Sequence, residues 1–171
     1  GLSLPDGMKS IQNGAFSGCT GLSGTLRFPD SITYLGDEAF SGCSGLTGLK
    51  LSENLESVTN SAFRGCTGIE GELVIPDKVT YLGYTAEIGT GAFLNNTSVS
   101  KISLPDTVEK IGVNAFRSCG SLKEVALGSG LVEIGDYAFY QCRNLTQNLV
   151  LPEGLKTICT YAFAECEYIT G

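Results

Sequence analysis

The chain has 171 residues, a formal net charge of −7 at pH 7, a sequence pI near 4.5 and no histidine. So acidic a chain is not expected to bind nucleic acid or an anionic membrane surface. Without histidine it has neither a mixed Cys/His zinc site nor a His-assisted nucleophile. No apolar run approaches the roughly 18 residues that a membrane span needs, and the length suits one domain.

One motif recurs along the whole chain every 23 or 24 residues, with a single interval of 30. Its clearest marker is an Ala–Phe pair, whose phenylalanines are Phe16, Phe40, Phe63, Phe93, Phe116, Phe139 and Phe163. Such a period is typical of a solenoid, in which each coil buries its apolar face only by packing against its neighbours. We therefore predict one solenoid over residues 1–171. Since both ends fall inside a repeat, we expect it to be a piece of a longer repeat domain.

Each repeat is predicted to contain a short strand, a Pro-containing turn, a second short extended segment and a helical turn. In the copy that runs from 101 to 116, the first strand is 101–104, the second segment is 109–111 and the helical turn is 113–116. Successive strands should pair in parallel, with right-handed crossovers. The expected fold class is an α/β repeat solenoid: a right-handed superhelix of about seven coils, with short parallel β-strands and short helical turns.

Apolar residues at fixed offsets from the Pro position are expected to form core columns. The column six residues after the Pro position contains Ile11, Leu35, Val58, Leu82, Ile111, Ile134 and Ile158. Six extra residues, Tyr84–Gly89, lengthen the fourth copy. A loop extruded to touch a partner and a tolerated surface insertion both account for them.

The unit LPxxVxxIGxxAFxxCxxLxxIxLP, seen from Leu104 to Leu127, resembles the BspA-type (Treponema-type) leucine-rich repeat. The chain departs from this pattern at Ser52 and Gly128, which replace Pro, at Asn96, which replaces Cys, and at the insertion. The resemblance implies a curved solenoid from a cell-surface or secreted protein. It also implies binding to other macromolecules, often host-matrix proteins.

Six of the seven cysteines stand three residues after the repeated Phe, and the exception is Cys159. The spacing stacks these six in a column with about 5 Å between neighbouring strands, with their Cβ atoms running parallel rather than toward each other. A reduced, buried ladder is favoured over disulfides or a metal site. The ladder would contain Cys19, Cys43, Cys66, Cys119, Cys142 and Cys166.

A row of carboxylates follows the Pro position in six copies. Turn chemistry accounts for it, because Asp after Pro suits a type I turn; an acidic edge that binds calcium or a cationic partner is the alternative. The row does not converge on a cleft, so we predict no enzyme, no cofactor and no metal. Its members are Asp6, Asp30, Glu53, Asp77, Asp106 and Glu153.

The outward strand positions form the candidate partner-binding face, since repeat proteins use such lateral faces for recognition. Tyrosines near the second segment are added because Tyr is a frequent interface anchor. The partner is expected to be another protein of the host matrix or cell surface, or a glycan. A spacer that holds other domains apart is the alternative role. The candidate residues are Arg27, Tyr34, Lys50, Val74, Tyr81, Tyr84 and Ser103.

Overall fold

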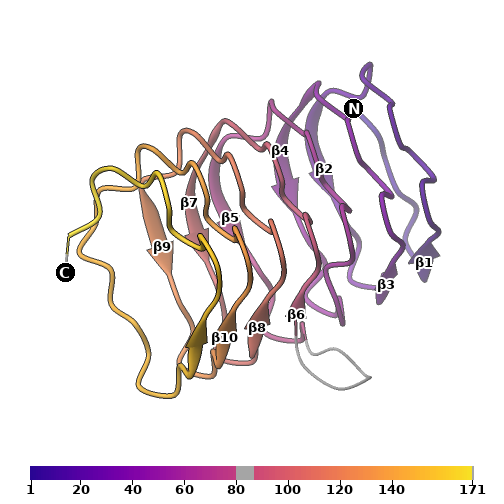
Figure 1. Ribbon diagram of the computed structural model, residues 1–171. Coiled ribbons are helices and arrows are strands. Elements are labelled where there is room, and N and C mark those ends of the chain that lie inside the picture. The colour runs from indigo at the N-terminus through magenta and orange to yellow at the C-terminus, as the bar shows by residue number, and fades with distance from the viewer. Residues whose placement is uncertain (80–86, 171) are drawn as a thin grey trace.

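The computed structural model describes residues 1–79 and 87–170. In this part of the chain, parallel strands follow one another along an elongated stack of coils (Figure 1). Each coil is named here by its Phe. The seven phenylalanines bound six full turns, in place of the expected seven coils, and their rings form six successive stacked pairs.

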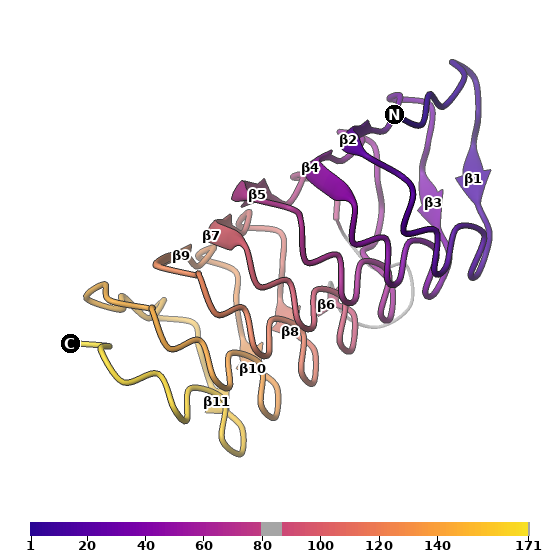
Figure 2. The ribbon, with the colours of Figure 1, turned by 90° about the horizontal axis from the view of Figure 1, so that it is seen from above.

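The strands lie in two tracks on different sides of the solenoid (Figure 2). The first strand track contains β2 (Gly24–Arg27), β4 (Leu46–Lys50), β5 (Gly71–Val74), β7 (Val99–Ser103) and β9 (Glu124–Ala126). The second contains β1 (Ser10–Ile11), β3 (Tyr34–Leu35), β6 (Glu87–Ile88), β8 (Lys110–Ile111), β10 (Glu133–Ile134) and β11 (Thr157–Ile158). All pairings between these strands are parallel, as predicted.

Both tracks are interrupted within the described residues. The first track divides into β2–β4 and β5–β7–β9. The second divides into β1–β3 and β6–β8–β10–β11, and Val58 joins the latter group through a single bridge to Ile88. The sheets alone therefore do not tie the whole stack together.

The Ala–Phe segments form a third column, the Phe edge, which runs without interruption from Phe16 to Phe163. At each of its six steps, three backbone N–H groups donate to carbonyls of the next coil; Phe16 N–H, for example, donates to Ala39 C=O at 2.8 Å. The intervening N–H groups donate three residues back within their own coil, as Cys19 does to Phe16. Every coil is thus bonded to the next at this edge.

The predicted helical turns are wrong, because the described residues contain no helix. The residue before each Ala and the residue two after each Phe have positive φ, as in Asn114 (57°) and Ser118 (59°). Isolated left-handed residues between right-handed ones turn alternate N–H groups toward the next coil and prevent a helical ladder. The hydrogen bonds between coils therefore replace those that a helix would make within itself.

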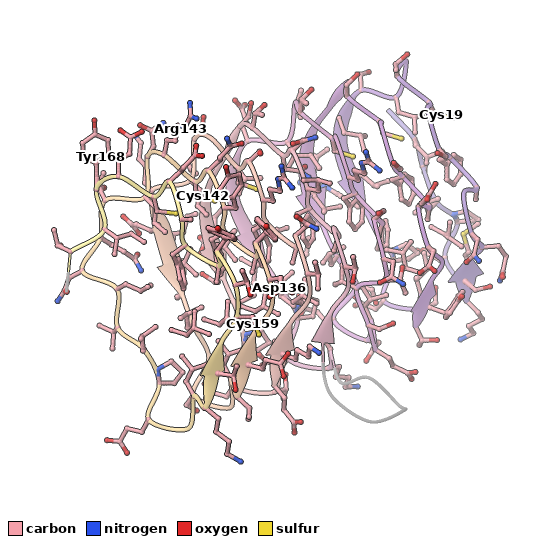
Figure 3. The ribbon with its side chains drawn as sticks, viewed as in Figure 1. Cys19, Asp136, Cys142, Arg143, Cys159 and Tyr168 are labelled. Carbon is pink, nitrogen blue, oxygen red and sulfur yellow. The ribbon has the colours of Figure 1, made fainter. Side chains whose placement is uncertain are left out.

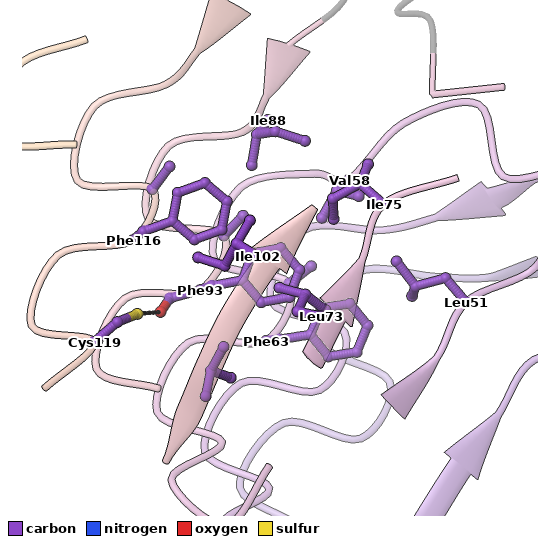
Figure 4. Close-up of a cluster of buried hydrophobic side chains, with 14 of the residues drawn as sticks. Leu51, Val58, Phe63, Leu73, Ile75, Ile88, Phe93, Ile102, Phe116 and Cys119 are labelled. Atoms are coloured by element: carbon purple, nitrogen blue, oxygen red, sulfur yellow. Dashed lines mark hydrogen bonds between the residues drawn. The ribbon is translucent and has the colours of Figure 1, made fainter. Parts of the chain in front are cut away.

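The core lies between the two tracks and the Phe edge, and it is one continuous cluster of buried apolar side chains (Figure 4). The rings of Phe40 and Phe63 stack with centroids 5.7 Å apart, and those of Phe93 and Phe116 with centroids 5.5 Å apart. The phenylalanines therefore lie in a single file, as the repeat spacing requires of stacked coils. Only the end rings, Phe16 and Phe163, are partly buried.

The insertion requires one correction to the predicted core columns. Ile88 pairs with Ile111 and bridges to Val58, so Ile88 occupies the position that the sequence assigned to Leu82. Its side chain is fully buried. Leu82 itself lies outside the described residues, as does the part of the insertion from 84 to 86. The end of the insertion, rather than its start, therefore restores the repeat.

Candidate functional site

Four of the predicted face residues lie on the first strand track. Arg27 pairs in register with Lys50, and both are exposed, so two cations stand side by side at one end of the track. Val74 pairs with Ser103, and the Ser103 hydroxyl donates to the Glu72 carboxylate at 2.7 Å. Because β4 and β5 are not paired, the structure forms two separate pairs rather than one row.

Tyr34, the one tyrosine of the predicted face that the structure describes, does not belong to this surface. Tyr34 lies in β3, on the second strand track, and its side chain is 42% exposed. Tyr81 and Tyr84 lie outside the described residues. The predicted candidates therefore occupy at least two faces of the solenoid.

A cluster that the sequence reasoning missed lies on the Phe edge of the last coils. It contains Arg117, Tyr137, Tyr140 and Tyr161, which we call the aromatic patch. The Arg117 guanidinium lies 5.7 Å from the Tyr137 ring centroid and 5.1 Å from that of Tyr140. The Tyr137 and Tyr161 rings stack at 5.3 Å, and the Tyr137 and Tyr140 rings meet edge to face at 5.5 Å.

Glu165 anchors the rim of this patch. Its carboxylate accepts hydrogen bonds from the Tyr140 hydroxyl and the Gln141 amide, and it pairs with Arg143 at 2.8 Å. These partners, with Tyr140 the strongest, hold the pKa of Glu165 at about 2, below its ordinary value. Arg143 lies with Tyr168 near the C-terminal end of the solenoid in Figure 3. Ion pairing and hydrogen bonding thus link the last two coils at the side of the aromatic patch.

Two tyrosines of the patch stand in an unusual backbone position. Tyr137 and Tyr161 have φ of 57° and 56°, in the left-handed region that favours Gly and Asn. The same place is left-handed in every other coil as well, where Gly14, Glu38, Ser61, Gly91 and Asn114 occupy it. A bulky residue there costs about 1–2 kcal/mol of backbone energy. The sequence signal was present, since Tyr precedes Ala–Phe in two successive repeats, but the left-handed backbone was not foreseen.

The cysteine column is buried in the core at Cys43, Cys66, Cys119 and Cys142, whereas, against the prediction, Cys19 is exposed and Cys166 is half-buried because they lie in the end coils. Each Cys after the first donates its S–H to the Phe carbonyl of the preceding coil, for example Cys66 to Phe40 at 3.1 Å and Cys119 to Phe93 at 3.5 Å (Figure 4). Burial raises the pKa of Cys66 and Cys119 to about 12. These thiols stay protonated at neutral pH, so they are poor nucleophiles and poor metal ligands.

Asn96 takes the place of Cys in this column and reproduces its hydrogen bond. Its side-chain amide donates to Phe63 C=O at 2.8 Å, but its carbonyl oxygen is buried without a partner among the described residues. The replacement preserves the link between coils and leaves one unsatisfied acceptor.

The carboxylate row stays in the turns. Asp106, for example, accepts a hydrogen bond from Ser129 N–H at 2.7 Å, which lowers its pKa. In residues 1–79 and 87–170, no three or more Cys, Asp or Glu side chains are grouped so that they could hold a metal ion. The same part of the chain has no helix with the length and apolar character of a membrane span.

Known proteins share this architecture. The chain is similar to a leucine-rich cell surface protein from Faecalibacterium prausnitzii, with 28% identity over 72% of this chain and a TM-score of 0.64. It is also similar to a leucine-rich repeat protein from T. pallidum, with 25% identity over 81% of this chain and 72% of that one, and a TM-score of 0.59. A leucine-rich repeat protein from Eubacterium ventriosum shares the fold at 20% identity, over 87% of this chain and 44% of that one, with a TM-score of 0.59.

The chain spans 30% of the length of the F. prausnitzii protein. No curated protein matches it. The family model described as the BspA type leucine rich repeat region matches residues 1–87 and 86–171, with six copies. The stacked phenylalanines, the parallel tracks and this match lead to one conclusion: the chain belongs to the BspA-type leucine-rich repeat family.

Proposed function

We propose that residues 1–171 act as one rigid, non-enzymatic binding module of a cell-surface or secreted protein, and that its partner is another protein. The aromatic patch is the observation that carries the proposal. Tyr and Arg are the residues most enriched among interface hot spots. Here Tyr161 is 59% exposed, and the stacked Tyr137 and the cation of Arg117 hold the patch in one arrangement.

The first strand track offers a second contact area for the same partner. Arg27 and Lys50 are adjacent exposed cations, and Val74 is 57% exposed. These residues are proposed as peripheral contacts, because exposed charges at the rim of an interface mainly affect association rates. The surface location is supported by the similarity to a protein described as a cell surface protein.

The experiment pairs capture with two tyrosine variants. Biotinylated chain is incubated with extracellular-matrix extract and serum, and the captured proteins are purified and their affinities measured by biolayer interferometry. Tyr137→Asn with Tyr161→Asn should weaken binding at least about tenfold. It should leave the melting temperature unchanged or higher, because Asn tolerates the left-handed backbone.

Tyr168→Asn is the matched control, since Tyr168 is exposed but takes no part in the ring stack described above. It should bind like the wild type. If no captured protein loses affinity in the double variant, the aromatic patch is not the binding site. The alternative role as a spacer, which the unbroken Phe edge would suit, would then be preferred.

A further inference from the structure

The second strand track is interrupted at one step, between the Phe40 coil and the Phe63 coil. At the other steps, the residue after the track's apolar residue donates its N–H to the preceding coil; Gly36 donates to Ile11 and Gly89 to Val58, each at 2.8 Å. Among the described residues, no such bond joins Thr59 to Leu35, and β3 has no strand pairing with Val58.

Thr59 explains the interruption. Glycine occupies this position in four other coils, at Gly36, Gly89, Gly112 and Gly135. A Cβ added to Gly36 would lie 2.3 Å from Asn13 N, so the first two coils approach too closely there for a side chain. Cys159 also stands at this position and keeps its bond to Ile134, whereas Thr59 carries a second heavy atom on its Cβ. The bulk of Thr59 therefore keeps its coil away from the preceding one.

Two cavities border this step. The first, about 390 Å³, is lined by Tyr34, Asp37, Ser57, Thr59 and Asn60, together with Val58 and Gly89. The second, about 480 Å³, reaches the Pro turns and includes Thr33 and Glu56 in its wall. The second cavity is strongly charged, since Lys9, Asp30, Asp77 and Lys78 also line it. We call the first cavity alone the inter-coil groove. Its volume falls within the roughly 300–1,000 Å³ of small-ligand sites.

The first cavity presents neutral polar groups and one aromatic ring. Among the residues that the structure describes, Asp37 is the only charged one in its lining. One Asp37 oxygen accepts Asn60 N–H at 3.1 Å, and the other has only a long contact of 3.5 Å with the Asn60 amide. Thr59 Oγ1 also has no hydrogen-bond partner in the described part of the chain, but it is buried and does not face the opening. Acceptor capacity therefore remains in the groove at Asp37.

We propose that the inter-coil groove binds a neutral oligosaccharide. Adjacent sugar hydroxyls both donate and accept, which suits a carboxylate next to an amide, as at Asp37 and Asn60. The apolar C–H face of a pyranose ring packs on an aromatic ring, and Tyr34 at 42% exposure supplies one. A peptide anchor would need an apolar pocket, whereas this lining is mostly hydroxyl, amide and carboxylate. The site is separate from the aromatic patch, and the inference does not depend on a protein partner there.

The test uses two aspartates with the same structural role. Asp37 accepts the N–H of Asn60, and Asp136 accepts the N–H of Thr160 at 2.8 Å in a later coil. The side-chain oxygen of Asn can accept the same bond: Asn13 accepts the N–H of Asp37, and Asn60 accepts the N–H of Thr90. Asp37→Asn and Asp136→Asn should therefore both fold, but only Asp37 lines the groove.

The probe is a printed array of neutral hexose oligosaccharides of two to four units, followed by saturation-transfer NMR and titration with those that are retained. Asp37→Asn should weaken binding at least about tenfold, the expected loss for a hydrogen bond to a charged group. Asp136→Asn should bind like the wild type. Thr59→Gly should remove binding, because the coils can then close over the groove.

Three results would overturn the proposal: no retained oligosaccharide at millimolar concentration, equal effects of the two aspartate variants, or full binding by Thr59→Gly. If Thr59→Gly fails to fold, the aspartate pair still decides. If no sugar binds but a protein is still captured, the proposal that the aromatic patch binds a protein stands. If a sugar binds but no protein is captured, only the aromatic-patch proposal is refuted.

Discussion

The Phe edge and the two strand tracks are built from the same repeat, but only the Phe edge continues without a break through the described coils. Three backbone hydrogen bonds cross each of its six steps, whereas among the described residues the second strand track loses its pairing at one step and the first track at more than one, between β4 and β5 and after β9. The difference follows the residues. Ala and Phe recur in every copy at the edge, but Gly gives way to Thr59 on the second track. Where every coil has the same residues, as at the Phe edge, the coils are evenly spaced. Where a larger side chain replaces glycine, as at Thr59, neighbouring coils move apart.

The contrast suggests a division of roles: the Ala and Phe residues of the Phe edge stabilise the solenoid, and the proposed binding sites use other residues. The Phe edge contributes continuous ring stacking and hydrogen bonding, which stiffen the solenoid. The interrupted second track provides the inter-coil groove. The position before Ala–Phe, which differs from coil to coil and holds Tyr137 and Tyr161 in the last two, provides the aromatic patch. Both proposed sites therefore lie at positions that the repeat does not keep constant. The following changes test how far the contrast holds.

The largest effect is expected from truncating the phenylalanine column. Phe116→Ala should lower the free energy of unfolding by about 3–5 kcal/mol, because Phe116 is fully buried and stacks on Phe93 and Phe139. Urea denaturation followed by circular dichroism measures it. Val74→Ala on the first track, at 57% exposure, is the control and should stay within about 0.5 kcal/mol. Similar losses for the two variants would contradict the assignment of the stability to the Phe edge.

A smaller effect, with the opposite sign, is expected for Asn96→Cys. The change restores the column and removes a buried acceptor without a partner, so it should raise the free energy of unfolding by about 1 kcal/mol. Cys119→Asn is the reciprocal variant and should destabilise by a similar amount, because it introduces the same unsatisfied oxygen. Thermal melts in reducing buffer compare the three proteins. A lower melting temperature for Asn96→Cys would show that the Asn oxygen is satisfied in solution.

The smallest effect concerns Glu165. Its pKa of about 2 lies below the unfolded value of about 4.3, so its ionised form stabilises the fold above pH 4.3. This contribution is lost as the pH falls through about 2. The melting temperature of the wild type should therefore exceed that of Glu165→Gln at pH 6, and the difference should vanish near pH 2. Glu153→Gln, on an exposed turn, is the control. A difference that does not change with pH would exclude the ionised carboxylate as its source.

The repeat pattern alone was sufficient to place the core. Phe40, Phe63 and Phe116 recur at nearly constant spacing, and equivalent residues of stacked coils must lie over one another. The same logic placed the cysteine column and the two parallel tracks, all of which the structure contains. The Ile88 column position was misassigned because two Leu/Ile–Gly endings, at Leu82 and Ile88, fit the pattern equally well.

The predicted partner-binding face stays a prediction. Arg27 and Lys50 are in register on the first track, and Tyr34 lies on the second track, where its spacing placed it. The aromatic patch was missed because its residues come from three successive coils and meet only when the coils stack. Its left-handed backbone also contradicts the helical turn that local propensity suggested.

The sequence by itself therefore determined the period, the buried columns and the parallel pairing, because these follow from residue spacing and the need to bury apolar side chains. Only the tertiary structure decided the conformation of the Phe edge, the grouping of Arg117 with Tyr137 and Tyr161, and the gap beside Thr59. These features depend on distances between neighbouring coils, and hydrogen bonds and side-chain bulk across the stack set those distances.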